Sequence, residues 1–341
     1  MNKVKMLGIG GNVHTWIQNW LSNRKQRVII NGIESSWVPV TSGVPQGSVL
    51  GPILFTIYIN DIDVGLNNTI SKFADDTKIG RPVLSEDDRQ SLQSDLIKIG
   101  EWSKKWQMPF NVNKCQVLQV GSNNNKYEYE INGHKINSTS QVKDLGVTIT
   151  SNLKTSTQCI IAANKANRSL GFIKRNFTYK SSNIVLPLYK SIVRPHLEYA
   201  VQFWAPYLVK DIKRLEAVQR RATKLIPSIR NKSYHERLKE LNLFSLEKRR
   251  ARGQLIECFK TLNGFNNVDA SKIFTVDHSG RTRGNGMKLK GQRANLDVTK
   301  HFYTHEIINE WNSLPTSVVN SKTIDTFKKR LDKHMEEKGV V

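Results

Sequence analysis

Residues 70–79 read ISKFADDTKI and place two adjacent carboxylates, Asp75 and Asp76, between two runs of β-forming residues. This pattern predicts a β-hairpin with the acidic pair at its tip. Like charges held this close repel each other, and a hard divalent cation that takes carboxylate oxygens as ligands would relieve the repulsion. By itself an Asp-Asp pair is weak evidence for a site, because turns also favour aspartate.

A glycine-rich segment lies upstream and reads SGVPQGSVLGP over residues 42–52. Its glycines would let backbone approach a ligand closely, and the helix expected from Leu50 would direct its N-terminal N–H groups at a phosphate. Together with two metal-binding carboxylates, such a segment suits in-line phosphoryl transfer, in which two divalent ions clamp the attacking and leaving oxygens. The structural alternative is a loop that only joins a strand to a helix.

The predicted secondary structure changes near residue 150. Before it, helices alternate with hairpin signals such as Asn31-Gly32 and Asn132-Gly133, which favour type I′ turns. We expect residues 27–30 and 37–40 to be the paired strands around the first of these turns. Beyond it, long amphipathic helices are predicted, and one apolar stripe runs through Leu208, Ile212, Leu215, Val218, Ala222 and Leu225. Residues 265–300 are polar and glycine-rich, as in a flexible connection, and a last helix carries Phe327 and Leu331.

Positive charge is concentrated in the second half of the chain. The 341 residues contain 52 Lys and Arg against 29 Asp and Glu, a formal net charge of +23. Residues 1–100 hold 10 basic and 9 acidic side chains, whereas residues 161–260 hold 22 and 7. This balance predicts a polyanionic partner such as RNA or DNA, although the surface of a basic protein is the plain alternative. The predicted phosphate contacts are Lys213, Arg214, Arg220, Arg221, Lys224, Arg249, Arg250 and Arg252.

Several classes of function are disfavoured. No apolar run approaches the roughly 18 residues of a membrane span, so no membrane partner is expected. The three cysteines form no C-x-x-C pair, which argues against a disulfide framework or a zinc ribbon. Phe203 and Trp204 could stack on bases, but their apolar neighbours favour a place in the core.

Taken together, the motifs resemble those of reverse transcriptases from non-LTR (LINE-like) retrotransposons. Residues 42–52 are similar to the palm motif that contacts template and incoming nucleotide, which implies that role for Ser42, Gly43, Pro45, Gln46 and Gly47. Phe73-Ala74-Asp75-Asp76 is similar to the catalytic box, with Phe in place of the commoner Tyr. Residues 110–115 resemble the next motif, whose lysine, here Lys114, is implied to act on the pyrophosphate leaving group. Residues 143–147 resemble the hairpin that grips the primer end.

The resemblance implies an α+β fold in three parts. The first is an incomplete polymerase palm over residues 1–150, in which β-hairpins pack with helices. The second is a mostly α-helical basic thumb over 151–265. The third is a flexible basic connection with a C-terminal helical tail over 266–341. The implied metal ligands are Asp75 and Asp76, with Mg²⁺ or Mn²⁺ as cofactor once the site is complete. The implied partners are an RNA template and a DNA primer, or an RNA–DNA hybrid. The family favours a nuclear over a cytoplasmic location.

One departure from the family pattern bears on activity. The palm of this family takes a third aspartate from a strand upstream of the helix that holds Trp16 and Trp20, and this sequence contains no such strand. We therefore expect the chain to be truncated and inactive alone, although by family it is an RNA-directed DNA polymerase. A non-catalytic nucleic-acid-binding remnant that uses the basic helices is the alternative, and an inert fragment is a third. Asp61 and Asp63 are expected to be structural or solvated.

Overall fold

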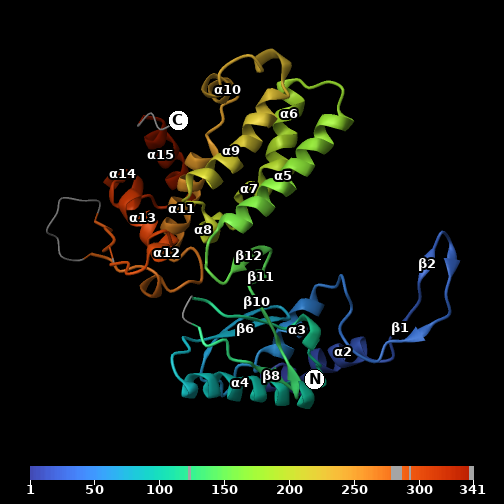
Figure 1. The fold of residues 1–341 in the computed structure, drawn as a ribbon. Coiled ribbons are helices and arrows are strands. Elements are labelled where there is room, and N and C mark those ends of the chain that lie inside the picture. The colour runs from blue at the N-terminus through green and yellow to red at the C-terminus, as the bar shows by residue number, and fades with distance from the viewer. Residues whose placement is uncertain (122–123, 278–285, 292, 338–341) are drawn as a thin grey trace. The chain divides into compact units, whose positions relative to one another are not determined.

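The chain is of mixed helical and β structure, which confirms the predicted α+β class (Figure 1). The computed structural model describes residues 1–121, 124–277, 286–291 and 293–337. It forms two compact units, unit 1 being Met1–Val117 with Asn124–Ser138, and unit 2 being Leu118–Asn123 with Thr139–Val341. Within the described ranges, no helix has the length and apolarity that crossing a membrane requires.

Short strands and four helices build unit 1. Its helices are α1 (Asn2–Met6), α2 (Gly11–Leu21), α3 (Leu50–Ile59) and α4 (Glu86–Lys105), with a 3₁₀ turn at Val112–Lys114. Its strands are β1 (Lys25–Gln26), β2 (Ile29–Ile30), β3 (Ile33–Glu34), β4 (Val38–Pro39), β5 (Thr69–Phe73), β6 (Asp76–Gly80), β8 (Glu130–Ile131) and β9 (His134–Lys135). Strands β7 (Gln116–Leu118) and β10 (Asn137–Thr139), which pair with each other, contain the points where the chain passes between units.

Helices dominate unit 2. After the hairpin β11 (Gln141–Asp144) and β12 (Val147–Thr150), the helices are α5 (Ser156–Asn176), α6 (Ser182–Leu188), a π-helical turn (Tyr189–Val193), α7 (Pro195–Glu198), α8 (Val201–Trp204), α9 (Val209–Lys224), α10 (Tyr234–Glu240) and α11 (Leu246–Leu262). The C-terminal helices are α12 (Asp297–Lys300), α13 (Tyr303–Asn312), α14 (Thr316–Val319) and α15 (Ile324–Glu337), and 3₁₀ turns lie at Pro227–Ile229 and Ala270–Lys272.

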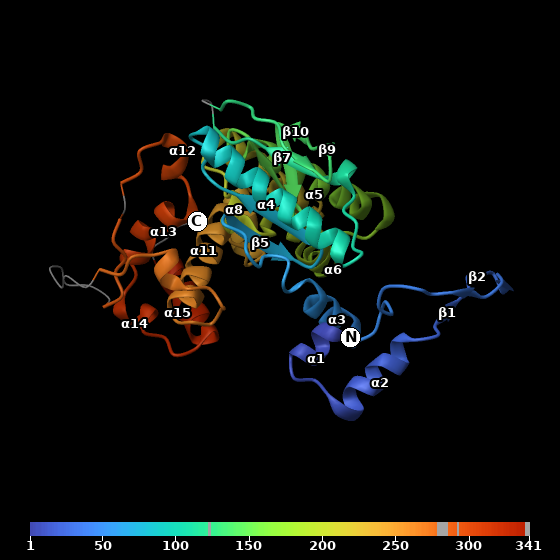
Figure 2. The same ribbon diagram turned by 90° about the horizontal axis from the view of Figure 1, so that it is seen from below.

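The first hairpin of unit 1 is an exposed arm. Asn31 and Gly32 have φ of 49° and 82°, the two positive values of the predicted type I′ turn. Our strand boundaries here were wrong: β2 pairs with β3, which follows the turn at once, while β4 returns to pair with β1. Figures 1 and 2 both show this arm reaching away from α2 and α3, and all eight strand residues are exposed.

The core of unit 2 has two main parts. In the first, the predicted apolar stripe of α9 packs on α5, with Leu215, Val218 and Ala222 all buried. In the second, α11 packs with α13, α14 and α15 (Figure 2), and Phe259 stacks on Phe327 with ring centroids 4.1 Å apart.

The C-terminal segment after residue 265 contributes side chains to the second core of unit 2. Residues from both sides of the predicted boundary at 265 contribute to it. Phe274 and Leu289, which fall in the stretch predicted as a flexible connection, are 4% and 3% exposed. Residues 278–285 and 292 of that stretch lie outside the described residues.

Candidate functional site

The acidic pair lies at the tip of a hairpin, as predicted. Strands β5 and β6 pair in antiparallel register down to Phe73 opposite Asp76, which leaves Ala74 and Asp75 as the turn. Ala74 has a φ of 50°, a left-handed conformation that costs a non-glycine residue roughly 1 kcal/mol. Asp75 and Asp76 are both exposed. Neither carboxylate has a hydrogen-bond or ion-pair partner in the part of the chain that the structure describes.

Buried polar contacts fix the base of this hairpin. The fully buried carboxylate of Asp95 on α4 accepts hydrogen bonds from the backbone N–H of Asn67 (2.9 Å) and of Asn68 (2.9 Å) and from the side-chain amide of Asn68 (2.7 Å), just before β5 begins. Burial alone would raise the pKa of Asp95, but these hydrogen bonds outweigh it and lower the pKa below its usual value. The acidic tip therefore stands on an anchored base.

The two acids that follow α3 have partners within unit 1. Asp61 accepts from Lys3 Nζ at 2.5 Å and from Trp102 Nε1 at 2.8 Å. Although burial raises the pKa of Asp61, these contacts lower it overall. Asp63 pairs with Lys72 at 2.7 Å. Both acids have the structural roles expected for them.

The glycine-rich loop is closed against the start of α3. Gly43 and Gly47 have φ of 75° and 81°, which glycine adopts without strain. The Ser48 hydroxyl donates to the Pro45 carbonyl (2.7 Å) and accepts from the Gly51 N–H (3.0 Å). A Cβ added at Gly51 would lie 2.9 Å from the Pro45 carbonyl oxygen, so glycine is required there by the contact between loop and helix.

The five residues assigned to template and nucleotide contact lie on this loop. Ser42, Gly43, Gln46 and Gly47 are exposed, and Pro45 is half-buried. Arg24 supports the near side of the loop by donating through Nη2 to the carbonyls of Ser42 (3.2 Å) and Gly43 (2.5 Å). The loop is therefore accessible to solvent, and hydrogen bonds from Arg24 hold its backbone in place.

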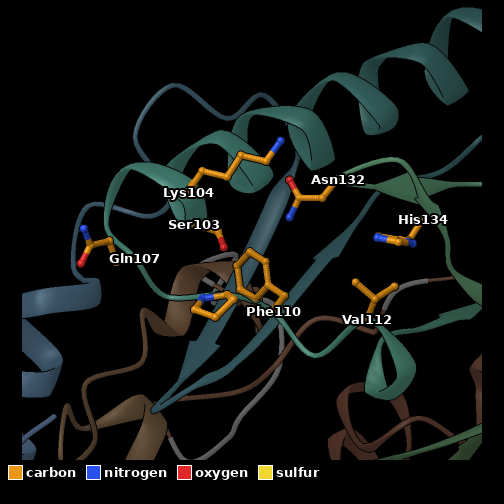
Figure 3. Close-up of a pocket in the computed structure, with 8 residues that line it drawn as sticks. Ser103, Lys104, Gln107, Phe110, Val112, Asn132 and His134 are labelled. Carbon is orange, nitrogen blue, oxygen red and sulfur yellow. The ribbon is translucent and has the colours of Figure 1, made fainter. Parts of the chain in front are cut away.

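The segment at residues 110–115, which resembles the motif after the catalytic box, contributes to the lining of a cavity. Phe110 and Val112 border a space of about 270 Å³ together with Ser103, Lys104, Gln107, Pro109, Asn132 and His134. Figure 3 shows Phe110 below α4, with Lys104 and Asn132 above it and His134 beside Val112. Lys114 ends the 3₁₀ turn that follows and is exposed. Among the described residues no hydrogen bond or ion pair joins Lys114 to Asp75 or Asp76.

The predicted primer-contacting hairpin belongs to unit 2. Strands β11 and β12 meet at Leu145 and Gly146, whose φ of 42° and 88° form a type I′ turn. Tyr199 donates its hydroxyl to the Leu145 carbonyl at 2.9 Å, and a Cβ added at Gly146 would lie 3.3 Å from the Tyr199 ring. Tyr199 thus supports the turn, and no sequence pattern pointed to it.

The basic residues predicted to contact phosphate fall into two groups. The five on α9 are exposed, opposite the buried stripe of that helix. Of the three on α11, two form ion pairs within unit 2 and the third is buried. Arg249 makes a two-pronged ion pair with Glu198, and Arg252 makes one with Asp332. Arg250 is 5% exposed, and burial lowers its pKa. We therefore keep the prediction of phosphate contact for α9 alone.

The two aromatic residues of α8 differ from each other. Trp204 is 2% exposed and donates through Nε1 to the Tyr199 carbonyl at 2.8 Å, as expected of a core residue. Phe203 is 65% exposed, so its assignment to the core was wrong. It points outward because helical geometry separates adjacent residues by about 100°, which places only one of them on the packed face.

The acidic pair has the donor chemistry of part of a divalent-metal site. Carboxylate oxygens are the ligands that Mg²⁺ and Mn²⁺ prefer, and both Asp75 and Asp76 are open to solvent. Within the described ranges, no group of three or more His, Cys, Asp or Glu side chains is placed to hold a metal ion. The hairpin can therefore supply two ligands.

This chain is similar in sequence to known RNA-directed DNA polymerases. Residues 1–149 match the family described as reverse transcriptase (RNA-dependent DNA polymerase). The chain is 28% identical over 248 residues to a probable RNA-directed DNA polymerase from transposon X-element of Drosophila melanogaster, covering 67% of this chain and 27% of that protein. It is 26% identical over 227 residues to the RNA-directed DNA polymerase from mobile element jockey of the same species, covering 62% and 24%. The jockey protein of Drosophila funebris is 27% identical over 240 residues, covering 66% and 26%. The chain spans about a quarter of the length of these relatives.

Proposed function

Since residues 1–149 belong to the reverse transcriptase family, we propose that this chain is part of an RNA-directed DNA polymerase of a non-LTR retrotransposon. The observation that carries the proposal is the exposed Asp75–Asp76 pair, which has no internal partner among the described residues and stands on a base anchored through Asp95. The repulsion between these adjacent carboxylates would be relieved by a bound divalent cation, for which their oxygens are suitable ligands.

The family generally uses divalent metal ions, and we assign them here to the hairpin. Asp75 and Asp76 would hold Mg²⁺ or Mn²⁺, with Asp75 as the main ligand and Asp76 as the supporting one. When bound, the ions supply charge stabilisation to both the attacking and the leaving oxygen. Lys114 is exposed and would offset negative charge on the leaving pyrophosphate. Backbone of the loop at residues 42–47 would position template and incoming nucleotide.

A second role is supported by unit 2. The exposed cations of α9 lie opposite a buried stripe and would bind the phosphates of an RNA–DNA hybrid without reading bases. A chain that used this surface alone would bind nucleic acid without catalysing synthesis. The two roles are separable, because the acidic hairpin and α9 belong to different units.

Primer extension on an RNA template tests the proposal. It should be run with residues 1–341 alone and with the same sequence in a polymerase of the relatives' full length. We expect Mg²⁺-dependent synthesis from the longer protein and a loss of roughly three or more orders of magnitude with Asp75→Ala, at about 1.4 kcal/mol for each tenfold. The matched control is Glu101→Gln, which alters an exposed acid on α4 and should leave the rate unchanged.

For residues 1–341 alone we expect no extension, because a two-metal site needs bridging carboxylates from two strands and the hairpin supplies one pair. Synthesis by the chain alone that is abolished by Asp75→Ala would contradict this expectation. It would show that another carboxylate completes the site. Full activity of the longer protein carrying Asp75→Ala would overturn the assignment of the hairpin itself.

A further inference from the structure

A basic cavity lies between α9 and α10 and is also lined by residues that directly precede α10. It has a volume of about 440 Å³, within the range of roughly 300–1,000 Å³ typical of small-ligand pockets. Five of its lining residues are cationic and none is acidic; the lining consists of Ala217, Arg220, Arg221, Lys224, Lys232, Ser233, Tyr234 and Arg237. Such a lining favours an anionic ligand.

Arg237 distinguishes this cavity from a patch of surface lysines. The residue is 2% exposed, yet its Nε and Nη1 have no hydrogen-bond partner among the described residues. Burial lowers the pKa of Arg237, and the nearby positive charge of Arg220 lowers it further. Buried guanidinium nitrogens without acceptors are costly, and an anion with several acceptor oxygens would remove that cost.

The acids nearest to the cavity have other partners. Glu240 pairs with Lys232, and Glu216 accepts from the Tyr234 hydroxyl and from the Leu246 N–H at 3.0 Å. Glu236 accepts from the Ser233 N–H at 2.7 Å, in the capping box of α10. None of these contacts supplies a counter-ion to Arg237.

The ring of Tyr234 argues against a base as the ligand. The Arg220 guanidinium lies over this ring at 4.1 Å from its centroid, and the Arg237 guanidinium lies 5.6 Å from it. The ring is thus already stacked on a cation, which leaves the charged guanidinium edges, rather than an aromatic face, as the binding groups. Guanidinium edges suit tetrahedral phosphate oxygens.

We propose that this cavity binds a backbone phosphate of a nucleic-acid strand, with Arg237 as its central ligand. The inference rests on the proposed function, because Arg220, Arg221 and Lys224 continue into the exposed basic face of α9 and would carry the neighbouring phosphates. Binding at the cavity would not depend on base sequence.

The test compares Arg237→Met with Lys239→Met in binding to a fluorescent single-stranded oligonucleotide over a range of salt concentrations. Lys239 is the matched control, because it lies on the same helix and is exposed. We expect Arg237→Met to weaken binding by roughly tenfold or more and to reduce the slope of log K against log salt by about 0.7. Since the substitution also removes a buried charge whose nitrogens lack acceptors, its melting temperature should be equal to or higher than that of the wild type. Lys239→Met should leave both quantities close to wild type.

A measurement on the wild-type protein tests phosphate binding at Arg237 even if the Arg237→Met variant fails to fold. The Nε–H resonance of Arg237 should shift on titration with inorganic phosphate, and the oligonucleotide should displace the phosphate. No shift with either ligand, or unchanged affinity and salt slope in a folded Arg237→Met, would overturn the proposal and leave the proposed function standing. A shift with phosphate that the oligonucleotide cannot displace would overturn the strand as its source. If the wild type bound no nucleic acid at all, the α9 surface and the strand assignment would both fail, while the phosphate response would still report on the cavity.

Discussion

The carboxylate of Asp95 accepts hydrogen bonds from both the backbone N–H and the side-chain amide of Asn68, at 2.9 and 2.7 Å. This contact joins the middle of α4 to the residue that precedes β5, so it fixes the strand that leads to Asp75. Because Asp95 is fully buried, its charge is held by these donors rather than by water.

We predict that Asp95→Asn lowers the free energy of unfolding of unit 1 by about 2 kcal/mol near neutral pH, since hydrogen bonds to a charged group are lost. The pKa of Asp95 is lowered in the folded state, so its stabilisation is complete above the unfolded pKa and is lost as the pH falls through the folded pKa. The difference between wild type and variant should therefore be constant near neutral pH and shrink below about pH 4. Urea titrations followed by tryptophan fluorescence would measure it. A difference that grew on acidification would contradict the assignment, and the exposed Glu101→Gln on the same helix is the control.

Gly51→Ala should disturb the loop at residues 42–47. A new Cβ would lie 2.9 Å from both the Pro45 carbonyl oxygen and the Ser48 hydroxyl, so the loop has to move. Alanine is intrinsically better than glycine in a helix by about 1 kcal/mol, so a lower melting temperature would demonstrate the contact. In a full-length polymerase we expect a higher KM for the incoming nucleotide. Gly80→Ala, where nothing lies within 4 Å of the added Cβ, is the control. Equal effects at both positions would argue against the loop contact.

Basic residues of α9 and α11 should respond differently to substitution. Lys213→Met removes an exposed cation, so it should reduce the salt slope for hybrid binding by about 0.9 with little change in stability. Arg252→Met breaks the ion pair with Asp332, in which both side chains are only partly exposed. It should lower the free energy of unfolding by about 1 kcal/mol without altering the salt slope for hybrid binding. Fluorescence anisotropy and thermal melting measure the two effects. A reduced slope with Arg252→Met would return α11 to the binding surface.

Divalent metal should bind at the acidic tip. Substoichiometric Mn²⁺ is expected to broaden the amide resonances of residues 74–77 selectively, and excess Mg²⁺ should reverse the broadening, because Asp75 and Asp76 are exposed and adjacent. Asp75→Asn should remove the effect. Asp63→Asn should not, since Asp63 is paired with Lys72. Broadening centred away from the hairpin would show that the metal ligands lie elsewhere.

Much of the local structure followed from the sequence. The dipeptides Asn31-Gly32 and Asn132-Gly133 predicted their type I′ turns because few residues adopt positive φ without strain. The acidic hairpin, the helix from Leu50 and the buried stripe of α9 were also predicted, since each depends on the periodicity of neighbouring side chains. Strand boundaries near Trp37 were wrong because short runs of β-forming residues do not fix their own register.

The sequence by itself determined the fold class, the position of Asp75 and Asp76 at the tip of a hairpin, and the exposed charge of α9, because these are properties of contiguous residues. Only the tertiary structure decided which charges are engaged. The sequence predicted that the arginines of α11 contact phosphate. In the structure Arg249 pairs with Glu198, 51 residues away, and Arg252 pairs with Asp332, 80 residues away. The same folding buried Arg237 with two of its nitrogens lacking an acceptor among the described residues, and it tied Asp95 to the base of the hairpin. Contacts between residues far apart in the chain depend on how helices pack, and no local pattern encodes them.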